Sequence, residues 1–185
     1  MMLEIDNTVL VLVDFQGKLA RIVQDSEQVI ASACKLARAA AVLELPIIWT
    51  QQNPAALGTT VEELAGLLPG EPIAKQAFSC WREPAFAKAL AGKARRSVLL
   101  AGIEAHICVF QTAADLCGAG YDVHVVAEAV SSRSADNRRI GLARCASAGA
   151  TITCVESALF ELLEAAGPDC PAGAGKFKEI LKLVK

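Results

Sequence analysis

The chain has 185 residues, of which 54% are apolar and 21% charged, and its formal net charge is −2. This composition excludes a disordered chain, which is poor in apolar residues and rich in net charge. The basic residues are scattered, so the sequence predicts no nucleic-acid partner. The mean hydropathy of +0.39 indicates either a sheet covered on both faces or a large subunit interface, and we expect a homo-oligomer, a dimer or larger.

No apolar run reaches the roughly 18 residues that a membrane-spanning helix needs. The N-terminal segment carries Glu4 and Asp6 and lacks the basic start of a signal peptide. The seven cysteines include no CxxC pair, which argues against a disulfide framework and against a cysteine-rich zinc site. We therefore expect a cytoplasmic protein that does not bind membranes.

The predicted elements alternate between strand and helix. Continuous runs of β-branched residues and leucine predict strands, and apolar residues at helical spacing predict helices. In chain order they are strand 8–13, helix 25–45, strand 46–50, a short helix within loop 51–70, an extended piece at 72–75, helix 83–92, strand 97–101, helix 105–118, strand 121–126, helix 135–149, strand 150–154 and helix 157–166. Ser157 is the expected cap of the last of these helices.

Strands that are separated by helices are joined by right-handed crossovers, which make the strands parallel. The sequence therefore predicts a three-layer α/β/α sandwich with a mostly parallel, Rossmann-like sheet. Neither an internal repeat nor a second domain is found, so residues 1–185 are expected to form a single domain. The amphipathic tail 176–185 is too short to hold a membrane and is expected to pack against its own subunit or a neighbour.

In a parallel sheet, ligands bind beyond the carboxyl ends of the strands. Asp14 directly follows the first strand, where an acid is costly to bury unless it is paired; alternatively, it is a helix cap or a solvated strand end. Cys108 follows the strand at 97–101 and falls in the first turn of the helix predicted at 105–118. The helix dipole there favours a thiolate and a lowered cysteine pKa; the alternative is a buried, inert thiol.

A nucleophilic cysteine needs a base, and neither histidine of the chain fits. His106 is two residues from Cys108 and points to a different side of a helix, and His124 alternates within a strand. Asp14 is a better candidate, because a carboxylate beside a thiol in an apolar pocket can act as base and then as acid. Lys75 lies between apolar neighbours and could hold this carboxylate; otherwise it is an ordinary surface lysine.

Several segments resemble the isochorismatase-like cysteine hydrolase superfamily. They are VLVLVDFQGKL, KQAFSCW, LLAGIEAHICVFQTA, DLCGAGYDVHVVAEAVSSRSADNRRIGLARCASAGA and FKEILKLV, and TQQNPAALGTTVEEL resembles its branch of isochorismatase-domain-containing proteins. The resemblance implies a catalytic triad of Asp14, Lys75 and Cys108. It also implies a cis peptide bond between Ile103 and Glu104, which turns the Glu104 N–H toward the Cys108 N–H to form an oxyanion hole.

The resemblance also limits the chemistry. The nicotinamidase branch of this superfamily uses an Asp-x-His metal motif after its second strand, whereas this chain has Thr50-Gln51-Gln52-Asn53 there. We therefore expect no metal, no cofactor and a substrate other than nicotinamide. Aryl isochorismatases that cleave an enol ether often lack the cysteine, so Cys108 favours acyl transfer through a thioester.

The predicted protein is thus a hydrolase that acts on carbon–nitrogen bonds other than peptide bonds, in a small amide or related acyl compound. The residues expected to line its substrate pocket are Phe15, Gln16, Gln51, Phe78 and Trp81. One alternative is a metabolite-binding or interaction protein that keeps the pocket without turnover. A redox-active cysteine protein is another, although Cys117 lies nine residues from Cys108, about 13 Å along the same predicted helix.

Overall fold

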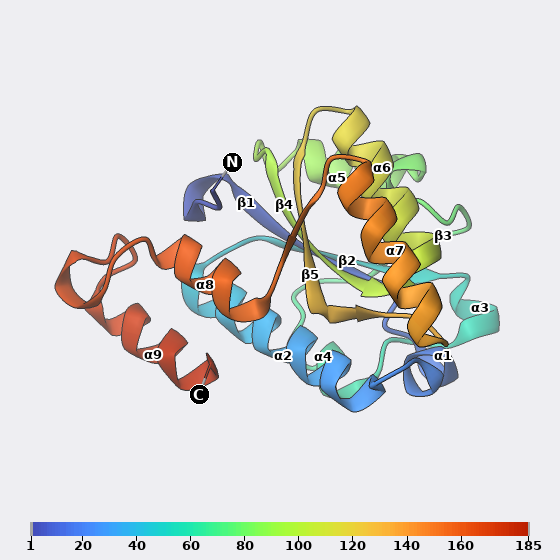
Figure 1. Cartoon of the computed structure of the whole chain (residues 1–185), viewed down its shortest axis with the longest axis horizontal. Coiled ribbons are helices and arrows are strands. Elements are labelled where there is room, and N and C mark those ends of the chain that lie inside the picture. The colour runs from blue at the N-terminus through green and yellow to red at the C-terminus, as the bar shows by residue number, and fades with distance from the viewer. Residues whose placement is uncertain (1, 185) are drawn as a thin grey trace.

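The computed structural model describes residues 2–184, so Met1 and Lys185, at the ends of the predicted domain and tail, lie outside the described residues. A sheet of parallel strands runs through the molecule in the order β3-β2-β1-β4-β5-β6 (Figure 1). The strands are β1 (Thr8–Val13), β2 (Ile47–Gln52), β3 (Ile73–Lys75), β4 (Ser97–Ile103), β5 (Asp122–Ser131) and β6 (Thr151–Thr153).

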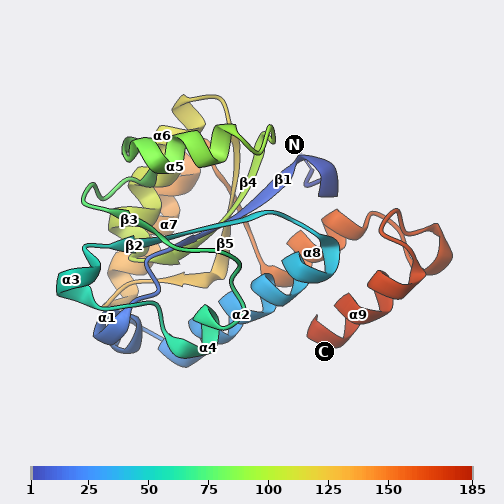
Figure 2. The ribbon, with the colours of Figure 1, turned by 180° about the vertical axis from the view of Figure 1, so that it is seen from behind.

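Helices cover both faces of this sheet (Figures 1 and 2). One face carries α1 (Gly17–Ile22), α2 (Ser26–Leu43), α4 (Glu62–Ala65), α8 (Val155–Leu163) and α9 (Ala174–Val184). The other face carries α5 (Pro84–Ala91), α6 (Phe110–Gly118) and α7 (Ala135–Ser147), and α3 (Pro54–Leu57) lies in the segment after β2. The predicted three-layer α/β/α architecture is confirmed.

Strand β1 shows why its sequence is a continuous apolar run. Its leucines, Leu10 and Leu12, face the core under α2, while Val9, Val11 and Val13 face the core under α5 and α6. Side chains alternate between the two faces of a strand, so a strand that is covered on both faces needs apolar residues at every position. The high mean hydropathy of the chain follows in part from this double burial.

Several predicted boundaries are wrong. The short helix α1 was not predicted, and α8 begins at Val155, capped by Cys154, whose sulfur accepts a hydrogen bond from the Ser157 N–H at 3.4 Å. Ser157 therefore lies inside the helix instead of capping it. Strand β5 runs on to Ser131, because its last residues pair with Gly102 and Ile103 of β4. This long-range pairing overrides the weak local preference of residues 127–131.

Two glycines allow close approaches at the carboxyl ends of the strands. A Cβ atom at Gly102, whose φ is +152°, would collide with the backbone and side chain of Val13 on β1. A Cβ atom at Gly141 of α7 would lie 2.5 Å from the carbonyl carbon of Ala105. These positions bring β1 and α7 against the chain that leads to Cys108.

The predicted C-terminal tail forms α9, which packs along α2 and α8 and buries Ile180 (Figure 1). Its first turn is tied to α2 by an ion pair of 2.6 Å between Lys176 Nζ and Glu44 Oε1. Packing against its own chain is one of the two outcomes expected for the tail. Across residues 2–184, no helix has the length and apolar character needed to cross a membrane.

Candidate active site

Three side chains from distant parts of the sequence lie at the carboxyl edge of the sheet. Asp14 follows β1, Lys75 is the last residue of β3, and Cys108 lies in the turn after β4. Asp14 and Lys75 are each 2% exposed and Cys108 is 7% exposed. Parallel strands bring their carboxyl ends to one edge, so residues that are 94 positions apart in sequence share one buried site.

Asp14 and Lys75 form a buried ion pair. Asp14 Oδ2 lies 2.7 Å from Lys75 Nζ, and the other carboxylate oxygen, Oδ1, accepts a hydrogen bond of 2.8 Å from Thr50 Oγ1. The backbone at Asp14 is left-handed, with a φ of +55°, a conformation that Asp adopts more readily than most residues. Asp14 is thus neither a helix cap nor a solvated strand end.

The Lys75 ammonium has further partners. It donates to Gln52 Oε1 at 2.7 Å and to the carbonyls of Phe78 at 3.1 Å and Ala77 at 3.2 Å. Burial by itself would lower the pKa of Lys75, but Asp14 together with the neighbouring Cys80 and Cys108 outweighs it, and the pKa lies above its ordinary value. Lys75 is therefore a fixed cation at neutral pH and not a surface lysine.

The environment of Cys108 corrects one expectation. The sequence predicts a helix start that lowers its pKa, but the segment Ala105–Val109 is a π-helical turn and α6 begins at Phe110. Burial, reinforced by the charge of Asp14 and opposed by Lys75, raises the pKa of Cys108 to about 12. Desolvation disfavours the charged form of a thiol, so the resting state at neutral pH is the thiol.

The turn before Cys108 has an unusual backbone. The peptide bond between Ile103 and Glu104 is cis, at the position where the resemblance implies one. The Glu104 carbonyl accepts hydrogen bonds from the N–H groups of Ile107 at 3.1 Å and Val109 at 3.2 Å. Within residues 2–184, this carbonyl takes no hydrogen bond from the intervening Cys108 N–H.

Side chains of the same turn anchor it to the segment after β5. Glu104 Oε1 accepts hydrogen bonds from the backbone N–H of Arg133 at 3.0 Å and from Arg133 Nε at 3.1 Å. His106 Nδ1 lies 2.9 Å from Ser132 Oγ. The His106 ring is therefore bonded to Ser132 and is not the base for Cys108. The contact of the Glu104 carboxylate with Arg133 holds the turn in place, and no pattern in the sequence indicated it.

A second thiol, Cys80, lies against the same cluster and was not singled out from the sequence. It is fully buried, its sulfur lies 3.7 Å from Thr50 Oγ1, and its backbone N–H donates to Thr112 Oγ1 at 2.9 Å. Thr112 lies four residues beyond Cys108. Burial raises the pKa of Cys80 to about 11, so it is also a thiol at neutral pH.

Two of the residues expected to line the pocket have other surroundings. Phe15 is 1% exposed and packs in the core under α2, on the opposite face of the sheet from the core that contains Cys108. The Gln16 side chain is fully buried and makes two hydrogen bonds to the backbone of Gln52. Its Oε1 accepts from the Gln52 N–H at 2.6 Å, and its Nε2 donates to the Gln52 carbonyl at 3.1 Å. Gln16 thus joins the ends of β1 and β2.

The other three expected pocket residues are dispersed. Gln51 is buried and donates to Thr60 Oγ1 at 3.0 Å. Trp81 packs edge-on against Tyr121, with ring centroids 5.6 Å apart, and Tyr121 follows the end of α6 that is remote from Cys108. Phe78 is 53% exposed, and its carbonyl binds Lys75. Of the five, Phe78 is the residue with both an exposed side chain and a direct backbone contact to the cluster.

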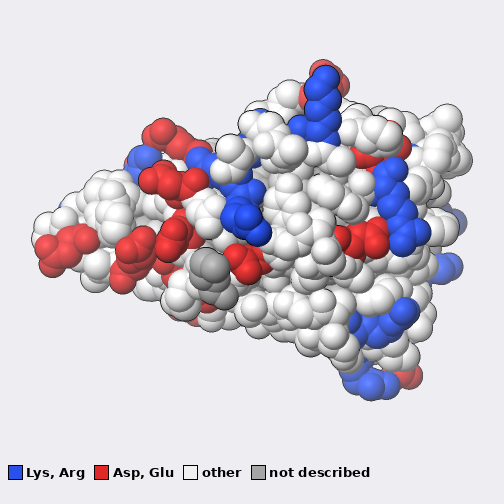
Figure 3. Space-filling model, turned by 90° about the horizontal axis from the view of Figure 1, so that it is seen from above, with Lys and Arg blue, Asp and Glu red and all other residues white. Residues whose placement is uncertain are grey.

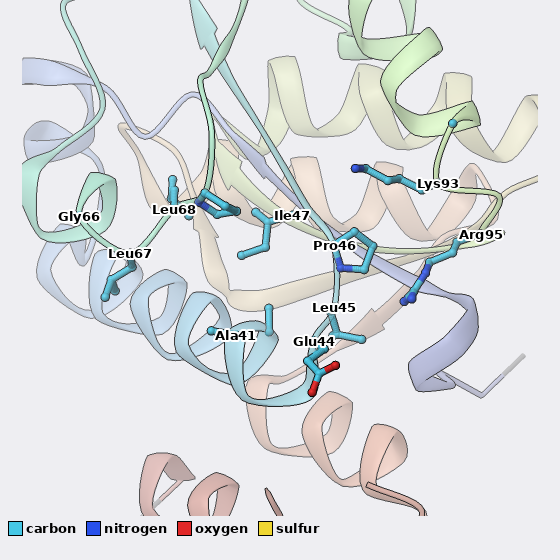
Figure 4. Close-up of a pocket in the computed structure, with 13 residues that line it drawn as sticks. Ala41, Glu44, Leu45, Pro46, Ile47, Gly66, Leu67, Leu68, Lys93 and Arg95 are labelled. Atoms are coloured by element: carbon cyan, nitrogen blue, oxygen red, sulfur yellow. The ribbon is translucent and has the colours of Figure 1, made fainter.

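A large open cavity lies elsewhere. It has a volume of about 640 Å³ and is lined by Ala40, Ala41, Glu44–Ile47, Gly66–Pro69, Gly92, Lys93 and Arg95 (Figure 4). These residues precede β2 and β4, so the cavity lies at the amino ends of the strands. None of Asp14, Lys75 and Cys108 lines this cavity. Its lining residues do not include a nucleophile beside a base.

The fold is shared with known proteins. The family model of the isochorismatase domain matches residues 8–157. The chain belongs to the isochorismatase family. Isochorismatase domain-containing protein 2A of Mus musculus is 38% identical over 181 residues, which cover 97% of this chain and 84% of that protein.

Two solved structures extend the likeness to nearly the whole chain. The MAR1 ribonuclease from Caenorhabditis elegans has a TM-score of 0.89 and 38% identity, covering 100% of this chain and 92% of its own. YcaC from Pseudomonas aeruginosa, with hexane-2,5-diol and covalent acrylamide, has a TM-score of 0.88 and 25% identity, covering 98% of this chain and 91% of its own. The isochorismatase-family chain described here therefore has the hydrolase fold of that superfamily.

Proposed function

We propose that this protein is a cysteine hydrolase that cleaves a small amide or a related acyl C–N bond, other than a peptide bond, through a thioester intermediate. The observation that carries the proposal is the buried ion pair of 2.7 Å between Asp14 and Lys75, next to the Cys108 thiol. A buried ion pair is costly to keep for stability alone. Perturbed titratable groups of this kind concentrate at catalytic sites.

The first half-reaction forms the thioester. Asp14 accepts the Cys108 proton, the sulfur attacks the substrate carbonyl carbon, and the carbonyl π electrons move to the oxygen. The backbone N–H groups of Glu104 and Cys108 stabilise this oxyanion. The Asp14 proton then goes to the nitrogen, the C–N bond breaks and the amine leaves.

Water completes the cycle. Asp14, again a carboxylate, takes a proton from water as the oxygen attacks the thioester carbonyl, and the C–S bond then breaks. The carboxylic acid leaves, and the proton on Asp14 returns to the Cys108 sulfur. Each step balances with water as the co-reactant, and no metal or cofactor takes part.

The two charged side chains have different tasks in this mechanism. The Lys75 ammonium is surrounded by Asp14, Gln52 and two backbone carbonyls, and it carries positive charge throughout. Its field favours the thiolate, as its lowering effect on the Cys108 pKa indicates. Asp14 is the group that moves the proton, because its carboxylate can accept one from the adjacent thiol, whereas the Lys75 ammonium keeps its charge.

The substrate must be small because Cys108 is only 7% exposed. We propose that it enters beside the exposed ring of Phe78, next to the carbonyl that binds Lys75. Phe15, Gln16 and Trp81, which the sequence assigned to the pocket, have no part in this proposal. Gln51 is bonded to Thr60 and remains a neighbour without an assigned role.

Alkylation tests the nucleophile. The native protein is incubated with iodoacetamide or acrylamide, and the rate at each of the seven cysteines is measured by peptide mass spectrometry. Cys108 is expected to react faster than the other cysteines despite its burial, because Asp14 can accept its proton as the sulfur attacks and Lys75 favours the thiolate that forms. A rate at Cys108 no higher than at the half-buried Cys117 and Cys154 would refute the assignment. A panel of small amides, with a Cys108→Ala control, then identifies the substrate.

Two rival functions are tested beside the amide panel, by adding RNA as a substrate and by measuring the binding of metabolites. One of the structural relatives is named a ribonuclease, but on the face seen in Figure 3 the Lys and Arg side chains are separated by acidic and uncharged ones. A nucleic-acid site needs a continuous basic surface. Hydrolysis of RNA, or tight metabolite binding with no turnover of any amide, would each replace the proposed reaction.

We also propose a homo-oligomer in the cytoplasm. Large apolar side chains remain exposed on neighbouring elements of the chain, among them Ile140 on α7, Ile152 on β6 and Phe160 on α8. We propose that a second copy of the chain covers these side chains. The cysteines within residues 2–184 are all free thiols, as in proteins of reducing compartments. A monomer mass in light scattering would contradict the oligomer.

A further inference from the structure

Strand β2 presents two polar side chains to the buried ion pair. Thr50 and Gln52 are alternate residues of this strand, and alternate residues of a strand share a face. The hydroxyl of Thr50 binds Asp14 Oδ1 at 2.8 Å, and the amide oxygen of Gln52 binds Lys75 Nζ at 2.7 Å. One strand therefore contacts the anion and the cation of the pair separately.

Thr50 fixes the orientation of the carboxylate. It is 1% exposed, so no bulk water replaces its hydroxyl. A hydroxyl has a single proton, and Thr50 donates it to Asp14 Oδ1, while its lone pairs face the Cys80 sulfur at 3.7 Å. With Oδ1 bound to Thr50 and Oδ2 facing Lys75, rotation of the carboxylate is blocked.

Gln52 is itself held from two directions. Its backbone N–H and carbonyl are bonded by the Gln16 side chain, at 2.6 and 3.1 Å. Its amide nitrogen donates to the Gln76 carbonyl at 2.8 Å, which leaves the amide oxygen toward Lys75. The amide cannot flip without losing both bonds, so the acceptor for the ammonium is oriented before any substrate arrives.

We propose that Thr50 and Gln52 are positioning residues that hold the Asp14 carboxylate and the Lys75 ammonium in the geometry that activates Cys108. The inference deepens the function proposed above and rests on it. Thr50 keeps the proton acceptor aimed at the thiol. Gln52 keeps the cation close enough to favour the thiolate that forms.

The test compares pairs of variants in the full-length protein. Thr50→Val removes the hydroxyl with little change of shape, and Thr50→Ser keeps it. Gln52→Met removes the amide oxygen at similar length. Thr8→Val is the matched control, because Thr8 is also fully buried in the sheet and, within residues 2–184, its hydroxyl has no hydrogen-bond partner. Thr8 lies at the amino end of β1, away from Asp14.

The readout is the rate of Cys108 alkylation by iodoacetamide from pH 5 to pH 10, with the melting temperature measured in parallel. Thr50→Val is expected to slow alkylation about tenfold at neutral pH, because the Asp14 carboxylate loses a hydrogen bond in a dry site and is no longer held toward the thiol. Thr50→Ser and Thr8→Val stay within about twofold of the native rate. The alkylation rate of Gln52→Met is expected to fall by only a few-fold, because Lys75 keeps its contacts with Asp14 and two backbone carbonyls.

Each outcome decides between a positioning and a structural role. If Thr50→Val and Gln52→Met lower the melting temperature but leave the alkylation profile unchanged, the two residues are structural only and the inference is wrong. If Thr50→Ser falls as far as Thr50→Val, the hydroxyl is not the cause, and the Thr50 assignment fails. If Cys108 in the native protein is no faster than the other thiols, the proposed function fails and the positioning roles fail with it; if native Cys108 is fast and the variants are unchanged, the positioning roles alone fail.

Discussion

The two ends of the sheet differ in what they bury. At the carboxyl end of the strands, the charged side chains of Asp14 and Lys75 and the thiols of Cys80 and Cys108 are almost inaccessible. At the amino end, an open cavity of about 640 Å³ carries Glu44 and Lys93 on its exposed rim (Figure 4). Buried charge, and not open volume, is therefore the feature on which the proposed active site rests. Exposed charges are solvated and cost little free energy, whereas buried charges are destabilising unless specific partners surround them.

The largest contrast is expected from the nucleophile. Cys108→Ala should lower the rate on any amide substrate found in the panel by about a thousandfold or more, because the thioester no longer forms. Initial rates with purified protein measure this loss. Cys145→Ala, which removes another buried thiol on the same face of the sheet, is the control and should retain the native rate.

Removing the Lys75 cation tests how much the ion pair at the carboxyl edge of the sheet contributes to stability. Lys75→Met leaves the Asp14 carboxylate buried without its partner, and we expect the free energy of unfolding to fall by about 3–5 kcal/mol. Lys93→Met at the rim of the amino-end cavity should change it by no more than about 0.5 kcal/mol. Urea denaturation measures both, and equal losses in the two variants would contradict the comparison.

Arg95 is the exception at the amino end, because it makes structural contacts. Its Nη1 donates to the carbonyls of Ile5 at 2.5 Å and Thr8 at 2.7 Å. Arg95→Met should lower the free energy of unfolding by about 2 kcal/mol through these lost bonds. The Cys108 alkylation profile should stay native, and a shifted profile would show that the two ends are coupled.

The smallest expected effect is a dependence on pH near the start of β5. His124 is 2% exposed, and burial lowers its pKa from the ordinary value of 6.5. The unfolded chain then binds a proton more readily than the folded one, so stability is full above about pH 6.5 and falls as the pH drops below it.

Melting temperatures at pH 7.5 and 5.5 measure this dependence. Replacing the histidine by His124→Leu should reduce the difference between the two temperatures. An unchanged difference would assign the acid sensitivity to other groups.

Much of the fold could be predicted from local patterns. The continuous apolar run of β1 and the helical spacing within α2 and α7 each follow from short stretches of sequence. The short helix α1, the length of β5 and the π-helical turn before α6 could not be predicted. These features depend on pairing and packing with distant residues, which a local pattern does not contain.

The candidate site was predicted unevenly for the same reason. Asp14 and Cys108 follow apolar strands, and the resemblance pointed to Lys75 as well. The supporting contacts of Thr50, Gln52 and Cys80 exist only because β2, β3 and the segment before α5 meet at one edge of the sheet. Among the predicted pocket residues, Phe15 follows Asp14 in sequence, but its side chain packs in the core on the opposite face of the sheet from Cys108.

The sequence by itself determined the class of fold and which residues can react, because double-sided burial and the identity of a side chain are local properties. Only the tertiary structure decided the state of those residues. The helix start predicted a lowered pKa for Cys108, but enclosure by neighbouring elements raises it to about 12. A pKa depends on all the charges and solvent around a group, and these are fixed only when distant segments pack together.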